Sequence, residues 1–420
     1  MLEGYLPPVW RQAEVNPPRS ITSDLRPISL TPVMSKCMEA FVVRWLLDTI
    51  GAKLDPCQYG NIKGRSTTLA LIRMMHDWAT ASDQNRAMVR VLLVDFGKAF
   101  DLIDHNILVT KLETLQVPAA LVRWIHAFLS DRRQRVRLQD DVSEWLSVNG
   151  GVPQRTKLGP ILFLVMINDL RFDVPTVKYV DDTTVYECIP KNGSSCLQSE
   201  ADALSQWCDS NGAKINTRKT VELRIDFSKL PRETSPVNIY SNDISTVSST
   251  KLLGVVVSND LSWSQNTDAI CKKASQRLHY LVHLRRAGLD SKQLVALYCS
   301  FVRPILEYCM CVWHFALTKT SSSSLERVQE RALHIIFGFD KSYDECLEKS
   351  AIVSLKERRE SRCRKLFCDM QRSDHVLHDL LPPLRQPSHS LRSFRAREPG
   401  LCHTDRCSKS FVHACLRYFQ

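Results

Sequence analysis

The spacing of apolar side chains divides the chain into strand-forming and helical segments. Residues 34–50 have a helical period, with an apolar face made of Met38, Phe41, Val42, Trp45, Leu46 and Ile50. Residues 89–96 form a near-continuous apolar run, which is typical of a central strand covered on both faces. From Leu261 onward the period is helical, over residues 270–286, 291–313 and 325–337. The pattern predicts a mixed region of strands and helices followed by a helical region.

Shorter segments fill the mixed region. Further helices are predicted at residues 68–79, 105–115, 119–129 and 197–208. Further strands are predicted at residues 174–179, 183–186, 218–227 and 251–257. The Ser-, Pro- and Asn-rich stretch 228–249 is interpreted as a surface connector or hairpin.

Arginines alternate along residues 132–138. In a strand, Arg133, Arg135 and Arg137 share one face, because successive side chains point to opposite sides. Such a face suits contacts to nucleic-acid phosphates. A charged, solvent-facing edge strand explains the pattern equally well.

Two adjacent acids, Asp181 and Asp182, lie between short β-prone runs. Neighbouring carboxylates repel each other and are poor strand formers, so folding alone gives little reason for them. A divalent cation gives a reason, since it prefers oxygen ligands and its charge cancels the repulsion. Taken alone, an Asp-Asp turn is more often a solvated acidic turn.

A third acid, Asp95, ends the apolar run 89–96 and precedes Gly97. Alone it reads equally well as a strand-terminal or helix-capping acid. Together with Asp181 and Asp182 it completes the minimal carboxylate set for two-metal phosphoryl transfer. In such a site one ion activates an attacking hydroxyl and the other stabilises the leaving phosphate.

Composition and charge favour a nucleic-acid partner. The 420 residues exceed one compact core, so two or three subdomains are expected. The net charge is +11, and residues 351–420 hold 14 Lys and Arg against 7 Asp and Glu. A basic excess attracts polyanions, although a well-solvated surface is the plain alternative.

The 15 cysteines are scattered through helix-like segments, and the first residues show no basic region followed by an apolar core. We therefore expect reduced thiols in a soluble protein of the nucleus or cytoplasm that is not secreted. The longest apolar run, residues 161–167, is too short to span a bilayer.

The C-terminal segment holds potential metal ligands: Cys402, His403, Cys407, His413 and Cys415. Their spacing, Cys-x4-Cys-x5-His-x-Cys, matches no compact zinc knuckle or finger. No zinc is expected, and packed or exposed thiols are the preferred interpretation.

Several motifs occur in a recognisable order. They are Asp24-Leu25-Arg26-Pro27-Ile28-Ser29-Leu30, Gln58-Tyr59-Gly60, Gly64-Arg65-Ser66-Thr67-Thr68, Val94-Asp95-Phe96-Gly97-Lys98-Ala99-Phe100-Asp101, Gly151-Val152-Pro153-Gln154, Tyr179-Val180-Asp181-Asp182, Leu252-Leu253-Gly254-Val255 and Arg303-Pro304-Ile305-Leu306-Glu307-Tyr308. Over nearly its whole length the chain resembles the reverse transcriptase domain of non-LTR (LINE-type) retrotransposons, particularly the CR1/jockey-like group, truncated at the N-terminus.

The resemblance implies an α+β right-hand polymerase. Residues 1–88 are then a fingers-like region and 89–257 the palm, which completes a reverse transcriptase domain of about 20–257. Residues 258–420 are a helical thumb and a basic C-terminal extension. The implied reaction is RNA-directed DNA synthesis, in which a DNA primer is extended on an RNA template with dNTPs. Two Mg²⁺ ions serve as cofactors, and no membrane is involved.

The resemblance also implies residue roles. Asp95 and Asp181 bridge the two metal ions, Asp182 supports them, and the Phe96 carbonyl is a further ligand. The residues expected around the nucleotide are Phe100 as a steric gate against a ribose 2′-hydroxyl, Gln154 against the incoming nucleotide, Lys63 and Arg65 near its triphosphate, and Lys219 as the acid for the leaving pyrophosphate. The alternative interpretation of Phe100 is a residue of the hydrophobic core. The alternative interpretation of the basic residues is that they are ordinary solvated surface residues.

Two departures from the family pattern stand out. Arg155 follows Gln154 where the family has glycine, so a bulky cation is expected to block the pocket or to force an unfavourable φ. A short Pro/Lys-bearing stretch is absent between Val15 and Asn16, and we expect a protein that lacks the family's endonuclease domain. The alternative function is therefore a catalytically decayed relic that only binds nucleic acid. A repair polymerase of different ancestry is disfavoured by the motif order.

Overall fold

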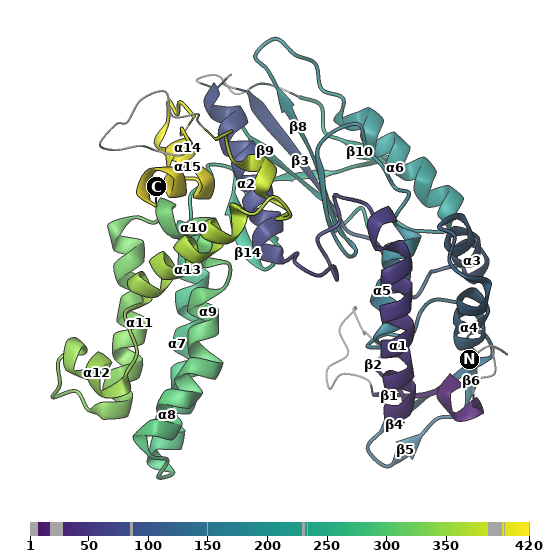
Figure 1. The fold of residues 1–420 in the computed structure, drawn as a ribbon, viewed down its shortest axis with the longest axis horizontal. Helices are drawn as coiled ribbons and strands as arrows, with labels where there is room; N and C mark the ends of the chain where they lie inside the picture. Colours follow the sequence, from purple (N-terminus) through teal and green to yellow (C-terminus); the bar gives the residue numbers. More distant parts are fainter. Residues whose placement is uncertain are drawn as a thin grey trace.

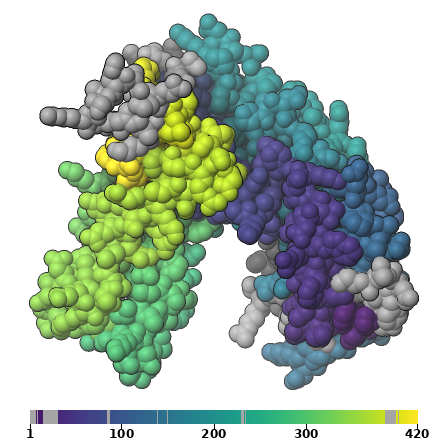
Figure 2. Space-filling model, in the orientation of Figure 1, coloured from purple at the N-terminus to yellow at the C-terminus, as the bar shows by residue number. Residues whose placement is uncertain are grey.

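The computed structural model describes residues 7–16, 28–84, 87–148, 150–228, 232, 234–384, 397–398 and 400–419. The motif at residues 24–30 lies largely outside the described residues. The described parts form an arch with two arms, and a β-sheet lies at its crown (Figure 1). In the space-filling view a deep notch separates the arm that contains α1 from the arm that contains α7 (Figure 2).

The crown sheet has the strand order β12-β9-β3-β8-β7. Its strands are β3 (Met88–Val94), β7 (Thr176–Tyr179), β8 (Asp182–Ile189), β9 (Val221–Ile225) and β12 (Ser245–Val247). The central strand β3 pairs antiparallel with both β8 and β9. The sequence run 89–96 therefore forms a central strand, as predicted.

Side chains of β3 alternate between two cores, which is why the run is apolar on both faces. Val89 and Val91 pack into one core, which continues through α2 (Thr67–Gln84) and the thumb helices as far as α15. Leu92 and Val94 pack into the other. That second core is covered by α1 (Val33–Ile50), α3 (His105–Thr114), α4 (Ala119–Leu129), α5 (Leu158–Met166) and α6 (Leu197–Asn211).

Sequence periodicity located several elements closely. Helix α4 and strand β4 (Arg132–Leu138) begin and end at the predicted residues. Helix α6 ends at Asn211, and Gly212 caps it with a left-handed φ of +65°. Within 228–249 a hairpin forms from β10 (Asn238–Ile239) and β11 (Asn242–Asp243), and Ile239 is buried in the second core.

One prediction about α1 was wrong. The buried side chains are Ser35, Glu39, Val42, Leu46 and Ile50, whereas Phe41 is 67% and Trp45 40% exposed. The buried face is rotated because the Glu39 carboxylate accepts hydrogen bonds from the Lys157 and Leu158 N–H groups at the start of α5. Burial raises the pKa of the Glu39 carboxyl.

A second sheet joins distant segments in the same arm. It contains β1 (Gln12–Asn16), β2 (Ile28–Leu30), β4, β5 (Asp141–Val142) and β6 (Leu146–Val148). Strand β4 pairs with β1 on one side and with β5 and β6 on the other. The interpretation of residues 132–138 as an edge strand is therefore wrong, because both sides of the strand are hydrogen-bonded.

The single strand predicted at 251–257 was wrong, because the segment forms a hairpin of β13 (Ser249–Leu252) and β14 (Val255–Ser258). Its turn needs Gly254, which has a φ of +87°, because a Cβ there would lie 2.9 Å from the Tyr308 ring. The Tyr308 hydroxyl donates to the Leu253 carbonyl at 2.8 Å. This contact ties the β13–β14 hairpin to the helical C-terminal region.

The second arm is helical. Its elements are α7 (Ser264–Arg286), α8 (Ser291–Leu297), a π-helical turn η3 (Tyr298–Val302), α9 (Arg303–Glu307), α10 (Met310–Trp313), α11 (Lys319–Phe337), α12 (Tyr343–Ser350) and α13 (Leu355–Met370). Short helices α14 (Asp405–Ser408) and α15 (Phe411–Tyr418) close the chain, and the 3₁₀ turns are η1 (Pro8–Arg11), η2 (Gly51–Lys53), η4 (His314–Ala316) and η5 (His378–Leu380).

The continuous helix predicted over 291–313 was wrong. Pro304 has no N–H to donate, and a π-turn precedes it. The chain then leaves the helix at Tyr308, and Cys309 takes a left-handed φ of +50°. Among the described residues no single helix is long and apolar enough to cross a membrane, and one pair bent by 41°, Ser291–Glu307 with Met310–Ala316, passes on length and composition.

Candidate active site

Strand register gathers the three acids at one edge of the crown sheet. Val94, the last residue of β3, pairs with Thr183 of β8. Asp95 follows Val94 and Asp182 precedes Thr183, so the two acids lie at the same edge of the sheet. Asp182 in turn pairs with Tyr179 across the β7–β8 turn that contains Asp181. Asp95 and Asp181 are half-buried and Asp182 is exposed. The side-chain oxygens of the three acids do not all lie within 4.8 Å of one another.

Strand β9 begins at the same edge. The Asp95 N–H donates to Thr220 Oγ1 at 3.2 Å, and the Asp95 carbonyl accepts from the Asn216 N–H at 2.8 Å. Lys219 is exposed and directly precedes Thr220. The lysine predicted to assist the leaving group therefore lies on the segment that borders Asp95.

The turn that carries Asp181 is strained. Only Val180 and Asp181 separate the paired residues Tyr179 and Asp182. Val180 has a φ of +59°, a left-handed conformation in which a β-branched residue is an outlier. Such strain costs about 1–3 kcal/mol and persists only where the surroundings enforce it.

Gln58 supplies that enforcement. Its buried Oε1 accepts from the Val180 N–H at 2.9 Å and from the Gly60 N–H at 2.8 Å. The Gln58 backbone also forms a parallel bridge with Lys178 of β7. Gly60 is needed here, because a Cβ on it would lie 2.5 Å from both the N and the Cγ2 of Val180. The Gln58-Tyr59-Gly60 motif thus holds the acidic turn.

A buried ion pair fixes the same segment. Lys178 Nζ lies 2.7 Å from Asp55 Oδ2, and both residues are buried. Burial alone would raise the pKa of the Asp55 carboxyl, but the charge and hydrogen bond of Lys178 outweigh it and lower that pKa. Sequence periodicity gave no signal for this pair, because its residues lie 123 positions apart.

Two loops meet beside the acidic edge. The Gly151 N–H donates to the Ile103 carbonyl at 2.9 Å, and the Val152 N–H donates to the Phe100 carbonyl at 2.8 Å. Gly151 has a φ of +74°, and a Cβ on it would lie 2.7 Å from the Asp101 carbonyl oxygen. The glycine is therefore required for the close approach of the two loops.

These loops line a pocket of about 340 Å³. Its walls include Lys98, Asp101, Arg133 and Gln154. Gln154 Nε2 donates to Asp101 Oδ1 at 3.0 Å. The structure thus brings Gln154, predicted to face the nucleotide, together with Arg133, predicted to contact phosphates.

Arg155 was expected either to block the pocket or to force an unfavourable φ, and the structure shows only the second effect. It has a φ of +62°, so the unfavourable backbone conformation is confirmed. Its side chain is exposed, and Arg155 is absent from the residues that line the pocket. The expected blockage of the pocket is therefore not seen in the described residues.

The two phenylalanines are packed into the protein. Phe100 is half-buried and stacks on Phe163 with the ring centroids 5.0 Å apart. This is the core packing that we considered as the alternative to a steric gate. Phe96 is buried and contacts Trp207 edge-to-face. Its backbone bridges Ile215 next to Asp95.

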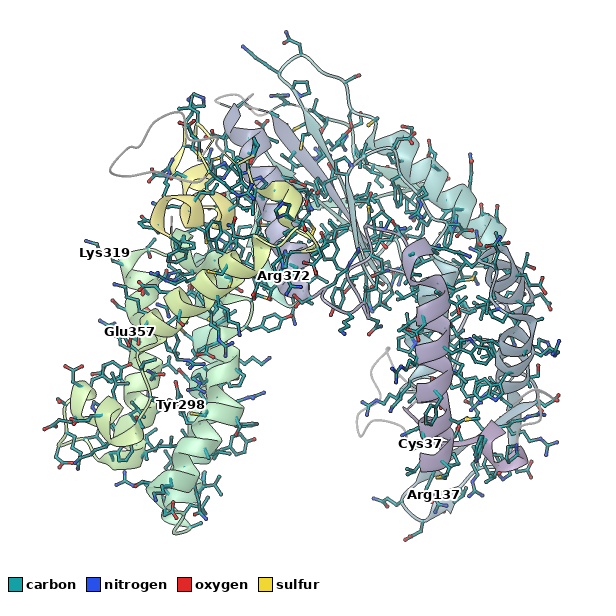
Figure 3. All side chains as sticks on the ribbon, in the orientation of Figure 1. Cys37, Arg137, Tyr298, Lys319, Glu357 and Arg372 are labelled. Atoms are coloured by element: carbon teal, nitrogen blue, oxygen red, sulfur yellow. The ribbon has the colours of Figure 1, made fainter. Side chains whose placement is uncertain are left out.

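The basic candidates are spread over several places. The Arg65 guanidinium donates to the Pro56 and Gln58 carbonyls, so it supports the Gln58 segment, while Lys63 is exposed. Arg135 lies over the Trp145 ring at 4.6 Å. Arg137 lies at the far tip of the arm, away from the crown sheet (Figure 3).

Sequence comparison identifies the family. The family model "Reverse transcriptase (RNA-dependent DNA polymerase)" matches residues 16–257, which include the acidic edge, the Gln58 segment and the Gln154 loop. The chain belongs to the reverse transcriptase family. Its fold is the α+β right-hand polymerase, and family members use divalent metal ions.

The relatives are polymerases of mobile elements. The chain is 26% identical over 356 residues to a probable RNA-directed DNA polymerase from transposon BS of Drosophila melanogaster, which covers 79% of this chain and 39% of that protein. It is also 26% identical over 363 residues to the RNA-directed DNA polymerase from mobile element jockey of the same species, which covers 80% of this chain and 38% of that protein. The chain therefore spans about two fifths of these relatives' length, and they confirm the resemblance to non-LTR reverse transcriptases.

Two further matches are more distant. Apo telomerase from Candida tropicalis superposes with a TM-score of 0.47 at 11% identity, over 81% of this chain and 59% of that one. A second family model, the N-terminal region of alkylated DNA repair protein alkB homolog 8, matches residues 263–303 in the thumb.

Proposed function

We propose that this chain is the RNA-directed DNA polymerase of a non-LTR retrotransposon. It would extend a DNA primer on an RNA template with dNTPs in the nucleus or cytoplasm. The observation that carries the proposal is the strand register that places Asp95 and the Val180–Asp181 turn at one edge of the crown sheet.

The donor set at this edge fits Mg²⁺. Three carboxylates and the Phe96 carbonyl offer hard oxygen ligands, which Mg²⁺ prefers. Asp95 and Asp181 would hold two ions, with Asp182 in support. When bound, the ions would supply charge to the attacking hydroxyl and to the leaving phosphate.

The neighbouring residues would position the substrates. The pocket at Gln154 and Arg133 offers an amide and a guanidinium, groups suited to a nucleotide and its phosphates. Phe100 directly precedes the pocket residue Asp101, but its ring stacks on Phe163, so core packing is favoured over a role as steric gate. Lys219 would donate a proton to the leaving pyrophosphate, and Lys63 would act near the triphosphate. Arg65 would instead support the Gln58 segment, because its guanidinium donates to the Pro56 and Gln58 carbonyls.

The second candidate, a relic that only binds nucleic acid, is not favoured. The match to the reverse transcriptase family spans all three acids, and Arg155 does not line the pocket.

The test is extension of a labelled DNA primer on an RNA template by the purified chain, with dNTPs and Mg²⁺. We expect extension that Asp181→Ala abolishes, with Arg155→Gly at least as active as the unaltered chain. The proposal would be overturned if Asp181→Ala still extended the primer. It would also be overturned if neither the unaltered chain nor Arg155→Gly extended it.

A further inference from the structure

Three side chains near the C-terminus converge on one point, far along the chain from the acidic edge. The Cys402 Sγ, the Cys407 Sγ and a ring nitrogen of His413 all lie within 4.8 Å of one another. Cys407 and His413 are buried, and Cys402 is half-buried. The sequence spacing had argued against zinc, and two of the five residues it singled out, His403 and Cys415, lie outside the cluster.

The spacing of the three atoms resembles that around a tetrahedral ion. Zinc–sulfur bonds of about 2.3 Å and zinc–nitrogen bonds of about 2.0 Å place the sulfurs about 3.8 Å apart and sulfur about 3.6 Å from nitrogen. The two sulfurs are 3.3 Å apart, and Cys407 Sγ lies 4.0 Å from the His413 ring nitrogens. These two distances therefore differ from the tetrahedral values by about half an ångström.

The surroundings orient the histidine. Ser410 Oγ lies 3.0 Å from His413 Nδ1, so it occupies that nitrogen and leaves Nε2 for a ligand. A hydrogen bond to the other ring nitrogen is the usual support of a metal-bound imidazole. The His413 ring also stacks on His76 of α2, with the ring centroids 5.1 Å apart.

The loop that carries Cys402 is fastened independently. The Asp83 carboxylate, at the end of α2, accepts from the His403 N–H at 2.8 Å and from the Thr404 N–H at 2.6 Å. These bonds hold Cys402 beside Cys407 without any contribution from the thiols. The cluster is thus built on a fixed loop and on a stacked ring.

We propose that Cys402, Cys407 and His413 bind one Zn²⁺ ion. Two thiolates and an imidazole are ligands for zinc rather than for Mg²⁺. Binding would release the two thiol protons to solvent, and a water molecule would take the fourth position. The ion would cross-link residues 402–413, and the His413 ring already stacks on His76 of α2.

The test uses the full chain, stripped of metal under reducing conditions and titrated with Co²⁺ as a spectroscopic substitute for Zn²⁺. Thiolate ligands give Co²⁺ an intense near-ultraviolet charge-transfer band that carboxylates do not give, so the acidic edge is silent. We expect one equivalent of Co²⁺ to produce the band, Zn²⁺ to displace it, and the melting temperature to rise with Zn²⁺. Failure of this test would leave primer extension unaffected, so it is distinguishable from failure of the proposed function.

The variants are matched by position. Cys402→Ser and His413→Ala should weaken Zn²⁺ binding by more than the roughly 10–100-fold that loss of a supporting partner costs, and Ser410→Ala should lie within that range. His403→Ala and Cys368→Ser, at exposed positions, should bind as the unaltered chain does. The proposal would be overturned if the unaltered chain gave no band, or if Cys402→Ser and His413→Ala kept the full band. It would also be overturned if Cys402 and Cys407 formed a disulfide that persists under the reducing conditions of the test.

Discussion

The Oε1 atom of Gln58 accepts a hydrogen bond of 2.9 Å from the backbone N–H of Val180, a residue 122 positions further along the chain. This bond holds a valine in a left-handed conformation next to the acid expected to bind metal. The geometry of the acidic turn therefore depends on a glutamine far upstream in the chain.

Gln58→Ala should lower kcat for primer extension by about 100-fold, because misplacement of a catalytic group by about 1 Å has that effect. Folding should weaken by about 1–3 kcal/mol for each of the two unpaired N–H groups, those of Val180 and Gly60. The matched control is Gln198→Ala. Gln198 also makes two hydrogen bonds with backbone: its Nε2 donates to the Asn238 carbonyl and its Oε1 accepts from the Asn238 N–H, in the β10–β11 hairpin. Equal losses of kcat in both variants would contradict a specific role for Gln58.

Gly60→Ala should disrupt the same turn from the opposite direction. The added methyl would lie 2.5 Å from the Val180 backbone nitrogen, so the turn must move and primer extension should fall to near background. Gly51→Ala is the control, since no atom lies within 4 Å of its added Cβ and its φ is −52°. Wild-type rates in both variants would show that the contact is dispensable.

Arg155→Gly should stabilise the fold by about 0.5–1 kcal/mol. A left-handed φ costs a residue with a Cβ about 1–2 kcal/mol, and the greater freedom of glycine in the unfolded chain offsets part of the gain. Arg155→Ala removes the charge but keeps the Cβ, so it should not stabilise. Urea denaturation of the three proteins separates the effects, and equal stabilisation by alanine and glycine would place the strain elsewhere.

A buried ion pair between β3 and β9 should make the stability of the fold depend on pH. Arg90 Nε lies 2.6 Å from Glu222 Oε1, and both residues are buried. Burial alone would raise the pKa of Glu222, but hydrogen bonds and charges from Arg224 and Arg90 outweigh it and hold that pKa below its ordinary 4.5. A lowered folded pKa gives stability above about pH 4.5, which is lost as pH falls through the folded value.

Glu222→Gln should therefore destabilise the protein at pH 7 by about 3–5 kcal/mol, because it leaves a buried arginine without its partner charge. The difference in unfolding free energy between the variant and the wild type should become smaller as the pH falls below about 4.5. Denaturation midpoints across this range measure it, with the exposed Glu144→Gln as control. A gap that stays constant with pH would show that the carboxylate charge contributes nothing.

Local sequence patterns located α4 and β4 because each forms from neighbouring residues with one clear period. They failed for α1, where the buried Glu39 is satisfied by N–H groups 118 positions away. They failed again at Tyr308, where the helix breaks and the hydroxyl bonds to Leu253. No period encodes contacts of this kind.

The acids themselves were visible from sequence, because Asp95, Asp181 and Asp182 together make up the carboxylate set of a two-metal site, although each motif alone has a common structural explanation. The support of their turn was not visible. Gln58 and Gly60 belonged to a recognised motif, yet their role follows only from the bridge between residue 58 and Lys178. Arg65 shows the reverse, since a basic residue expected at the triphosphate bonds to carbonyls of the Gln58 segment.

The most direct test of the central claim compares the unaltered chain with Asp95→Asn in primer extension on an RNA template, as Mg²⁺ is varied. Asn keeps the size of the side chain and removes its charge. We predict Mg²⁺-dependent extension by the unaltered chain and a loss of at least about 100-fold with Asp95→Asn, at an unchanged melting temperature. Equal extension by both proteins would contradict the assignment of this edge as the polymerase site.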